Sequence, residues 1–76
     1  LIKLYPNPAN QYIALEGLEN GDKVHWIDVS GRVVKTATYQ ATRFEIEDLV
    51  PGFYLLKIQR KGANLKILKM IKNNTR

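Results

Sequence analysis

Few side chains in this sequence of 76 residues have the chemistry of a catalyst. The only histidine is His25, the only serine is Ser30, and cysteine is absent. A Ser-His-Asp triad would have to use both residues, yet Ser30 lacks the Gly-x-Ser-x-Gly surroundings of a nucleophile elbow. The composition excludes a cysteine nucleophile, thiolate-bound zinc and a two-histidine metal site, and no glycine-rich loop could hold a phosphate. We expect no enzymatic activity and no cofactor.

A metal site at His25 would have to recruit the nearest carboxylates, which belong to Asp22 and Asp28. Both lie an odd number of positions from His25. In a strand they would therefore point to the opposite face of the sheet. We interpret His25 as a surface residue of a strand and expect no metal.

Charge is unevenly distributed along the chain. Residues 1–56 hold five basic and seven acidic side chains, a net charge of −2, whereas residues 57–76 hold seven basic and none acidic, a net charge of +7. The asymmetry favours a recognition surface at the C-terminal end, with a solvated face as the alternative. Nucleic-acid binding would require aromatic side chains among the basic ones, and residues 65–72 contain none.

Turn signals recur every eight to twelve residues, a spacing typical of small all-β domains. We predict strands over residues 1–5, 11–16, 23–29, 32–38, 43–47, 53–60 and 65–71. Alternation places one apolar set on the inward face of these strands. Its members are Ile13, Leu15, Val24, Trp26, Phe44, Ile46, Tyr54, Leu56 and Ile58. Seven such strands predict an antiparallel immunoglobulin-like β-sandwich, and a five-stranded OB-type barrel is the main alternative.

Two loops have sequences that restrict the backbone. Pro6-Asn7-Pro8 should form a rigid extended loop, because each proline fixes φ and removes a ladder donor. Asp28 and Gly31 occupy the first and fourth positions of a predicted type I turn, where the carboxylate caps backbone amides and glycine supplies a positive φ.

The second half of the chain contains two further turn signals. Pro51-Gly52 is a favoured central pair of a type II turn. Tyr54 follows it at the position of a tyrosine corner, with its hydroxyl expected to bond back to the preceding loop. Residues 61–64 should close a hairpin to the last strand.

Four of these segments, in this order and spacing, resemble a known family. They are Leu4–Asn10, Val24–Val34, Leu49–Tyr54 and Lys57–Ile58, followed by the lysine-rich last strand. Together they are similar to the type A C-terminal sorting domain of the type IX (Por) secretion system of Bacteroidetes, over essentially the whole chain.

The resemblance implies an immunoglobulin-like fold of seven strands and a role in export. Such a domain is the non-catalytic C-terminal address that takes a periplasmic cargo protein across the outer membrane, after an N-terminal signal peptide has directed export to the periplasm. Its expected partners are the type IX translocon and a sortase-like cysteine peptidase that removes the domain. The cargo is then released or anchored at the cell surface. The first residue is leucine, so we expect a longer precursor with an unknown N-terminal cargo domain.

Lysines in the last strand are the first candidates for translocon recognition, and the loop Pro6-Asn7-Pro8 is the next. Lys66, Lys69 and Lys72 recur every third residue, so a flat strand would turn Lys69 to the opposite face from the other two. A bulge or strong twist near Leu68 would instead bring the three together. Recognition could also use strand addition at this edge.

Two other functions fit parts of the pattern. A carbohydrate-binding or adhesion module could use Tyr12, Trp26 and Tyr39 as a sugar platform, although the inward parity of Trp26 favours the core. A basic OB-type domain could bind single-stranded nucleic acid. We prefer a single sorting domain over residues 1–76, with 72–76 as a frayed tail, no nucleic-acid partner and no stable membrane insertion.

Overall fold

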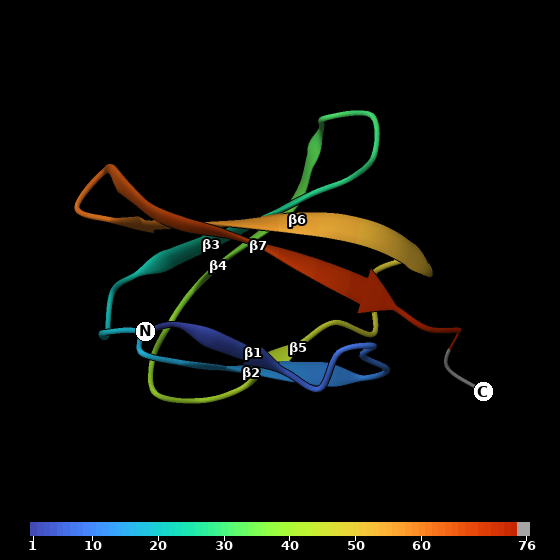
Figure 1. Ribbon diagram of the computed structural model, residues 1–76, viewed down its shortest axis with the longest axis horizontal. Coiled ribbons are helices and arrows are strands. Elements are labelled where there is room, and N and C mark those ends of the chain that lie inside the picture. Colours follow the sequence, from blue (N-terminus) through green and yellow to red (C-terminus); the bar gives the residue numbers. More distant parts are fainter. Residues whose placement is uncertain (75–76) are drawn as a thin grey trace.

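The computed structural model describes residues 1–74, and within them seven strands form two antiparallel sheets without any helix (Figure 1). The strands are β1 (Lys3–Tyr5), β2 (Tyr12–Glu16), β3 (Lys23–Ile27), β4 (Val33–Thr38), β5 (Phe44–Glu45), β6 (Gly52–Arg60) and β7 (Ala63–Lys72). One sheet has the order β1-β2-β5 and the other the order β4-β3-β6-β7. The predicted all-β class is confirmed. The alternative of a five-stranded barrel is wrong, because the strands divide between two layers.

The core lies between the two layers and consists of the side chains that alternation predicts to face inward. Trp26 is fully buried near its centre, with the Phe44 ring edge-on at 5.5 Å between centroids. Burying one face of every strand is what lets so short a chain form a core. All nine residues predicted to face inward are buried, together with Ala9, Leu49 and Met70.

Asp28 organises the connection between β3 and β4 as predicted. Its Oδ1 accepts hydrogen bonds from the Ser30 amide at 2.9 Å, the Ser30 hydroxyl at 2.7 Å and the Arg32 amide at 3.1 Å. The Gly31 amide donates to the Asp28 carbonyl at 2.9 Å, and Gly31 has a φ of 89°. The carboxylate therefore replaces water as the acceptor for the amides of this tight turn.

The corner before β6 differs from the expectation. Gly52 has a φ of 148°, far from the value near +80° that a type II turn requires, so this turn type was wrong for Pro51-Gly52. The hydrogen-bonded turn lies earlier, where the Leu49 amide donates to the Ile46 carbonyl at 3.1 Å. Gly52 instead begins β6 in an extended conformation that favours glycine.

Tyr54 forms the expected tyrosine corner. Its ring is buried and its hydroxyl donates a hydrogen bond to the carbonyl of Val50 in the preceding loop. The hydroxyl of this buried side chain thus has a hydrogen-bond partner, and the loop is bonded to the beginning of β6.

The hairpin between β6 and β7 is tighter than predicted. Ala63 already pairs with Arg60, which leaves only Lys61 and Gly62 in the turn. Both have positive φ, 51° and 81°, the geometry of a two-residue type I′ hairpin. The four-residue loop expected over 61–64 was wrong, because residues 63 and 64 already pair with β6. The sequence did not indicate the shorter turn, since lysine is uncommon at a left-handed position.

The core assignment predicts a large difference between two leucines of the β6–β7 hairpin. Leu56→Ala should lower the free energy of unfolding by about 2–5 kcal/mol, because Leu56 is fully buried and its removal leaves a cavity. Leu65→Ala is the matched control: Leu65 is 40% exposed, so its loss should cost about 0.5 kcal/mol. Urea unfolding followed by circular dichroism measures both, and equal losses would contradict the assignment.

Candidate recognition surface

The loop Pro6-Asn7-Pro8 lies against the outer edge of the last strand. The Asn7 side chain accepts a hydrogen bond from the Ile71 amide at 3.0 Å and donates one to the Lys69 carbonyl at 3.2 Å. Its amide group therefore occupies the place that a neighbouring strand would take beside β7. A residue near the N-terminus, 62 positions before Lys69, thus holds the C-terminal strand.

Ala9 continues this contact along the same edge. Its amide donates to the Ile71 carbonyl, and its carbonyl accepts from the Asn73 amide, both at 2.7 Å. Asn7 and Ala9 together cover the edge of β7 from Lys69 to Asn73. We name this set of contacts the edge clamp. It gives Asn7 a structural role, while direct contact of Pro6 and Pro8 with secretion machinery stays a prediction.

The three candidate lysines do not share one face. Lys66, Lys69 and Lys72 pair with Ile58, Leu55 and Gly52 in one unbroken register, so strict alternation turns Lys69 away from the other two. Of the two alternatives left open by the sequence, the register thus selects the strand without a bulge near Leu68. The register instead shifts at the base of the hairpin, where Leu65 is the extra residue between Asn64 and Lys66.

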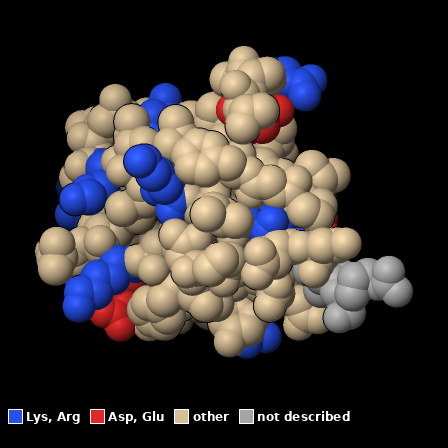
Figure 2. Space-filling view, turned by 45° about the vertical axis from the view of Figure 1, so that its right-hand side comes forward, with Lys and Arg blue, Asp and Glu red and all other residues tan. Residues whose placement is uncertain are grey.

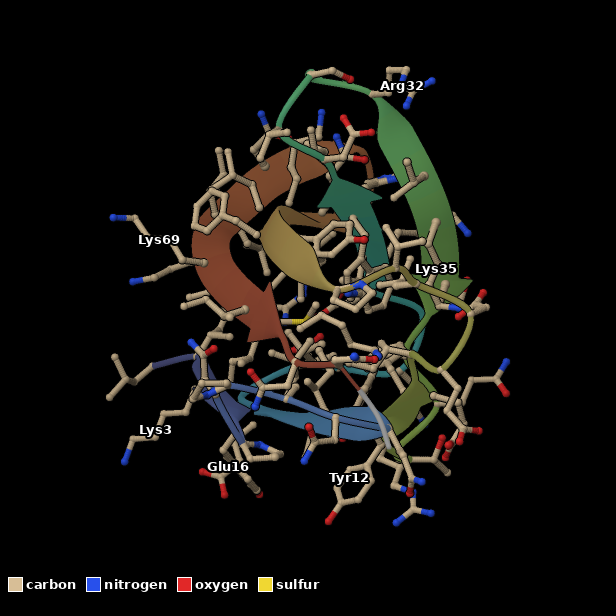
Figure 3. All side chains as sticks on the ribbon, turned by 90° about the vertical axis from the view of Figure 1, so that its right-hand side faces the viewer. Lys3, Tyr12, Glu16, Arg32, Lys35 and Lys69 are labelled. Atoms are coloured by element: carbon tan, nitrogen blue, oxygen red, sulfur yellow. The ribbon has the colours of Figure 1, made fainter. Side chains whose placement is uncertain are left out.

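Lys72 also differs from the expectation of an exposed lysine. Its side chain is 4% exposed, and its ammonium group donates to the Asn73 carbonyl at 3.2 Å. Lys72 is thus the last residue of β7, and the Asn73 amide is hydrogen-bonded to Ala9. Residues 75–76 of the predicted tail lie outside the described residues. Within β7 the exposed charge comes from Lys66 and Lys69, and in Figure 3 Lys69 points away from the space between the two sheets.

Acidic and basic residues are distributed unevenly between the two sheets, as they are along the chain. Strands β3, β4, β6 and β7 contain no acidic residue, whereas β2 and β5 each contain one glutamate. The distribution of charge along the sequence indicates positive charge only in the C-terminal part, and the contribution of β3 and β4 emerges from the sheet order. The basic residues of the four-stranded sheet are Lys23, Lys35, Lys57, Arg60, Lys66, Lys69 and Lys72.

The model of a protein family, described as the secretion system C-terminal sorting domain, matches residues 3–73. The match includes the edge clamp, the Asp28 turn, the tyrosine corner and the whole of β7. The chain belongs to this family. Searches of curated proteins and of solved structures returned no significant match.

The family assignment confirms the resemblance to type IX secretion sorting domains. The chain is therefore a C-terminal sorting signal of that system, which implies contact with the secretion machinery and export to the cell surface or beyond. Sorting domains of this family are in general not enzymes.

An ion pair that was not expected from the sequence connects the end of β6 to the loop before β3. Arg60, at the end of β6, donates two hydrogen bonds of 2.9 and 2.8 Å to the carboxylate of Asp22, which is 2% exposed. The Glu19 amide donates to the same carboxylate at 2.8 Å. The Arg60 hydrogen bonds hold the pKa of Asp22 below its ordinary value. Distance in sequence hides such a pair, since 38 positions separate the two residues.

The aromatic platform considered for sugar binding does not form. Trp26 is fully buried between the sheets, whereas Tyr12 is 38% exposed and lies under the Arg43 guanidinium at 4.2 Å from the ring centroid. Tyr39 packs against Phe44, 6.2 Å between ring centroids. The three rings thus belong to different environments.

His25 lies on the outer face of the four-stranded sheet, hydrogen-bonded to Thr36 at 3.0 Å and Gln59 at 2.9 Å. Residues 1–74 hold no cluster of three or more His, Asp or Glu side chains with metal-site geometry. They also hold no helix of the length and apolarity that a membrane span requires.

The edge clamp predicts a local effect of removing Asn7. Asn7→Ala should speed hydrogen exchange at the Ile71 amide and lower the free energy of unfolding by about 1–2 kcal/mol, since two exposed hydrogen bonds are lost. NMR measurement of hydrogen exchange at the Ile71 amide tests this prediction. Asn74→Ala, a change at an exposed asparagine after β7, is the control and should leave the Ile71 amide protected. Equal protection in both variants would rule out the clamp.

Asp28 predicts a pH dependence of stability. Hydrogen bonds from the Ser30 hydroxyl and the Arg32 amide lower the pKa of Asp28 from 3.8 to about 2. The folded state binds this proton more weakly than the unfolded state, so the stabilisation is complete above pH 3.8 and is lost as pH falls toward 2. Ser30→Ala removes one donor and should raise the pH at which acid unfolds half of the protein. Val29→Ala, at a side chain 82% exposed in the same turn, should not change it.

Proposed function

We propose that the folded domain, rather than a short linear segment, is the address that the type IX machinery reads. The observation that supports this is the role of the residues that carry the family resemblance. Asp28 orders a turn and Tyr54 fixes a corner through local contacts. Asn7 holds β7 across 64 positions of sequence, so its contact exists only in the folded state. A signal that includes the Asn7 contact presents a folded surface, since the loop and β7 meet only when the two sheets are assembled.

The sheet orders β1-β2-β5 and β4-β3-β6-β7, with a tyrosine corner at the start of β6, support an immunoglobulin-like topology. In our proposal this domain ends a precursor from a member of the Bacteroidetes. The precursor carries an N-terminal signal peptide and an upstream cargo domain. A sortase-like cysteine peptidase removes the domain after passage across the outer membrane, so the mature cargo is found at the cell surface or outside without it.

The proposal predicts that residues 1–76 suffice to export a foreign protein. A periplasmic reporter with an N-terminal signal peptide and this domain at its C-terminus should reach the surface or medium of a type IX-competent host. Immunoblotting of periplasmic and extracellular fractions measures the exported share, and the exported reporter should be shorter by the mass of the domain.

Three controls complete this test. The reporter without the domain, and the full fusion in a host lacking the translocon, should both stay in the periplasm. The fusion carrying Leu56→Ala should be exported less than the unaltered fusion, because it lowers the folded fraction of the domain while changing no exposed residue. Export of the reporter without the domain, or retention of the intact fusion, would overturn the proposed function.

A further inference from the structure

The outer face of the four-stranded sheet carries exposed apolar side chains. On β6 and β7 three cross-strand pairs lie in successive rows: Phe53 with Ile71, Leu55 with Lys69, and Lys57 with Ile67. We name these six residues the outer patch. Phe53 is 40% exposed, Ile71 47% and Ile67 56%, and Leu55 is half-buried between them.

The face is set by the register of the strands. Tyr54, Leu56 and Ile58 point into the core, so the residues that alternate with them on β6 point outward. The same holds on β7 for the neighbours of buried Met70. Clusters of exposed apolar side chains on one face of a small protein mark places where another molecule binds.

The outer patch is positively charged and has no acidic side chain within it. Lys57 and Lys69 occupy diagonally adjacent positions, about 7–8 Å apart by ordinary sheet geometry. The strands of this sheet contain no aspartate or glutamate that could pair with either lysine. Figure 2 shows one face of the molecule on which lysine and arginine side chains lie on a mostly uncharged surface and acidic side chains are few.

Protection against edge-to-edge aggregation accounts for only half of this pattern. Charged side chains on an edge strand discourage pairing with another chain, which would explain Lys69 on β7. It would not explain Phe53, Ile67 and Ile71, whose exposed apolar surface favours association. The edge clamp already covers the edge of β7 beside Lys69 and Ile71, so strand addition is blocked there.

The edge clamp also holds the outer patch in one geometry. The backbone of Lys69 and Ile71 is paired with β6 on one side and bonded to Asn7 on the other. Little conformational entropy remains to be lost there when a partner binds.

We propose that the outer patch docks a protein surface in which apolar side chains surround two carboxylates that face Lys57 and Lys69. This inference rests on the proposed function, and within it the partner is a component of the export machinery. A second copy of this chain fits poorly, because a two-fold contact would bring the same lysines together without an acid. A lipid surface also fits poorly, because Lys69 lies between Ile67 and Ile71 on β7 rather than at the rim of the apolar residues.

The test compares two charge-matched double variants of the reporter fusion. Lys57→Glu/Lys69→Glu reverses the outer patch and should lower the exported share by about tenfold. Lys3→Glu/Lys61→Glu makes the same charge change on β1 and in the turn between β6 and β7, and export should stay within about twofold of the unaltered fusion. Circular dichroism of both purified fusions checks that the domain is folded. Equal export by the two folded variants would overturn the proposal.

A second pair of variants tests the apolar part without changing charge. Ile67→Thr keeps a β-branched side chain on the outer patch, and Val29→Thr makes a similar change at an exposed turn position. Only Ile67→Thr should reduce export. An unchanged exported share for Ile67→Thr would show that the apolar surface has no role, and the proposal would fail.

Photo-crosslinking identifies the class of partner. A photoreactive amino acid in place of Ile67 should form an adduct with a protein segment that contains acidic and apolar residues, and Lys57→Glu/Lys69→Glu should abolish that adduct. An adduct with a second copy of the fusion would overturn the proposal. Binding of the fusion to vesicles of phosphatidylethanolamine and phosphatidylglycerol, lost in the same double variant, would also overturn it in favour of a membrane.

Failure of the two proposals can be told apart. Retention of the unaltered fusion in the periplasm would overturn only the export function, and the crosslink from position 67 would still decide what the outer patch binds. Normal export with equal behaviour of the matched variants would leave the export function standing and overturn the docking surface.

Discussion

The outer edge of β7 is the constraint on which the arrangement of this domain depends. A strand at the edge of a sheet presents unpaired amides and carbonyls, which invite pairing with other chains. Asn7 and Ala9 satisfy these groups from Lys69 to Asn73. The same contacts join the first loop of the three-stranded sheet to the last strand of the other sheet. The edge clamp therefore closes an edge, connects the two layers and fixes the strand that carries Lys66 and Lys69.

The separation of charge between the two sheets serves attraction of a partner rather than stability of the fold. The ion pairs that do involve the four-stranded sheet reach into loops, from Arg60 to Asp22 and from Lys35 to Asp48. Lys57 and Lys69 have no acidic neighbour of this kind on their own face. One side of the molecule thus keeps a field of one sign, which favours attraction of an acidic surface before contact is made.

Local patterns predicted most of the fold, because alternation and turn chemistry depend on neighbouring residues. Nine of the twelve buried apolar positions, the Asp28 turn and the corner at Tyr54 follow from such patterns. The differences concern features that several strands decide jointly. The length of the β6–β7 turn depends on how the two strands pair, and the burial of Lys72 depends on what covers the end of β7.

The candidate site was predicted less completely than the fold for the same reason. The sequence indicated that Pro6-Asn7-Pro8 is rigid, but the partner of Asn7 lies more than sixty residues away. Lysine spacing indicated two possible faces, and only the register decides between them. The apolar half of the outer patch went unnoticed, since Phe53, Ile67 and Ile71 look like ordinary strand residues until the sheet shows which face they occupy.

The position of Trp26 gives the domain an intrinsic optical probe. It is the only tryptophan, it is fully buried between the sheets, and its indole nitrogen has no hydrogen-bond partner within the described residues. An indole in such a dry setting emits at shorter wavelength than one in water. Closure of the two layers on each other can therefore be followed through its emission, without a label and with the surface of the molecule left unaltered.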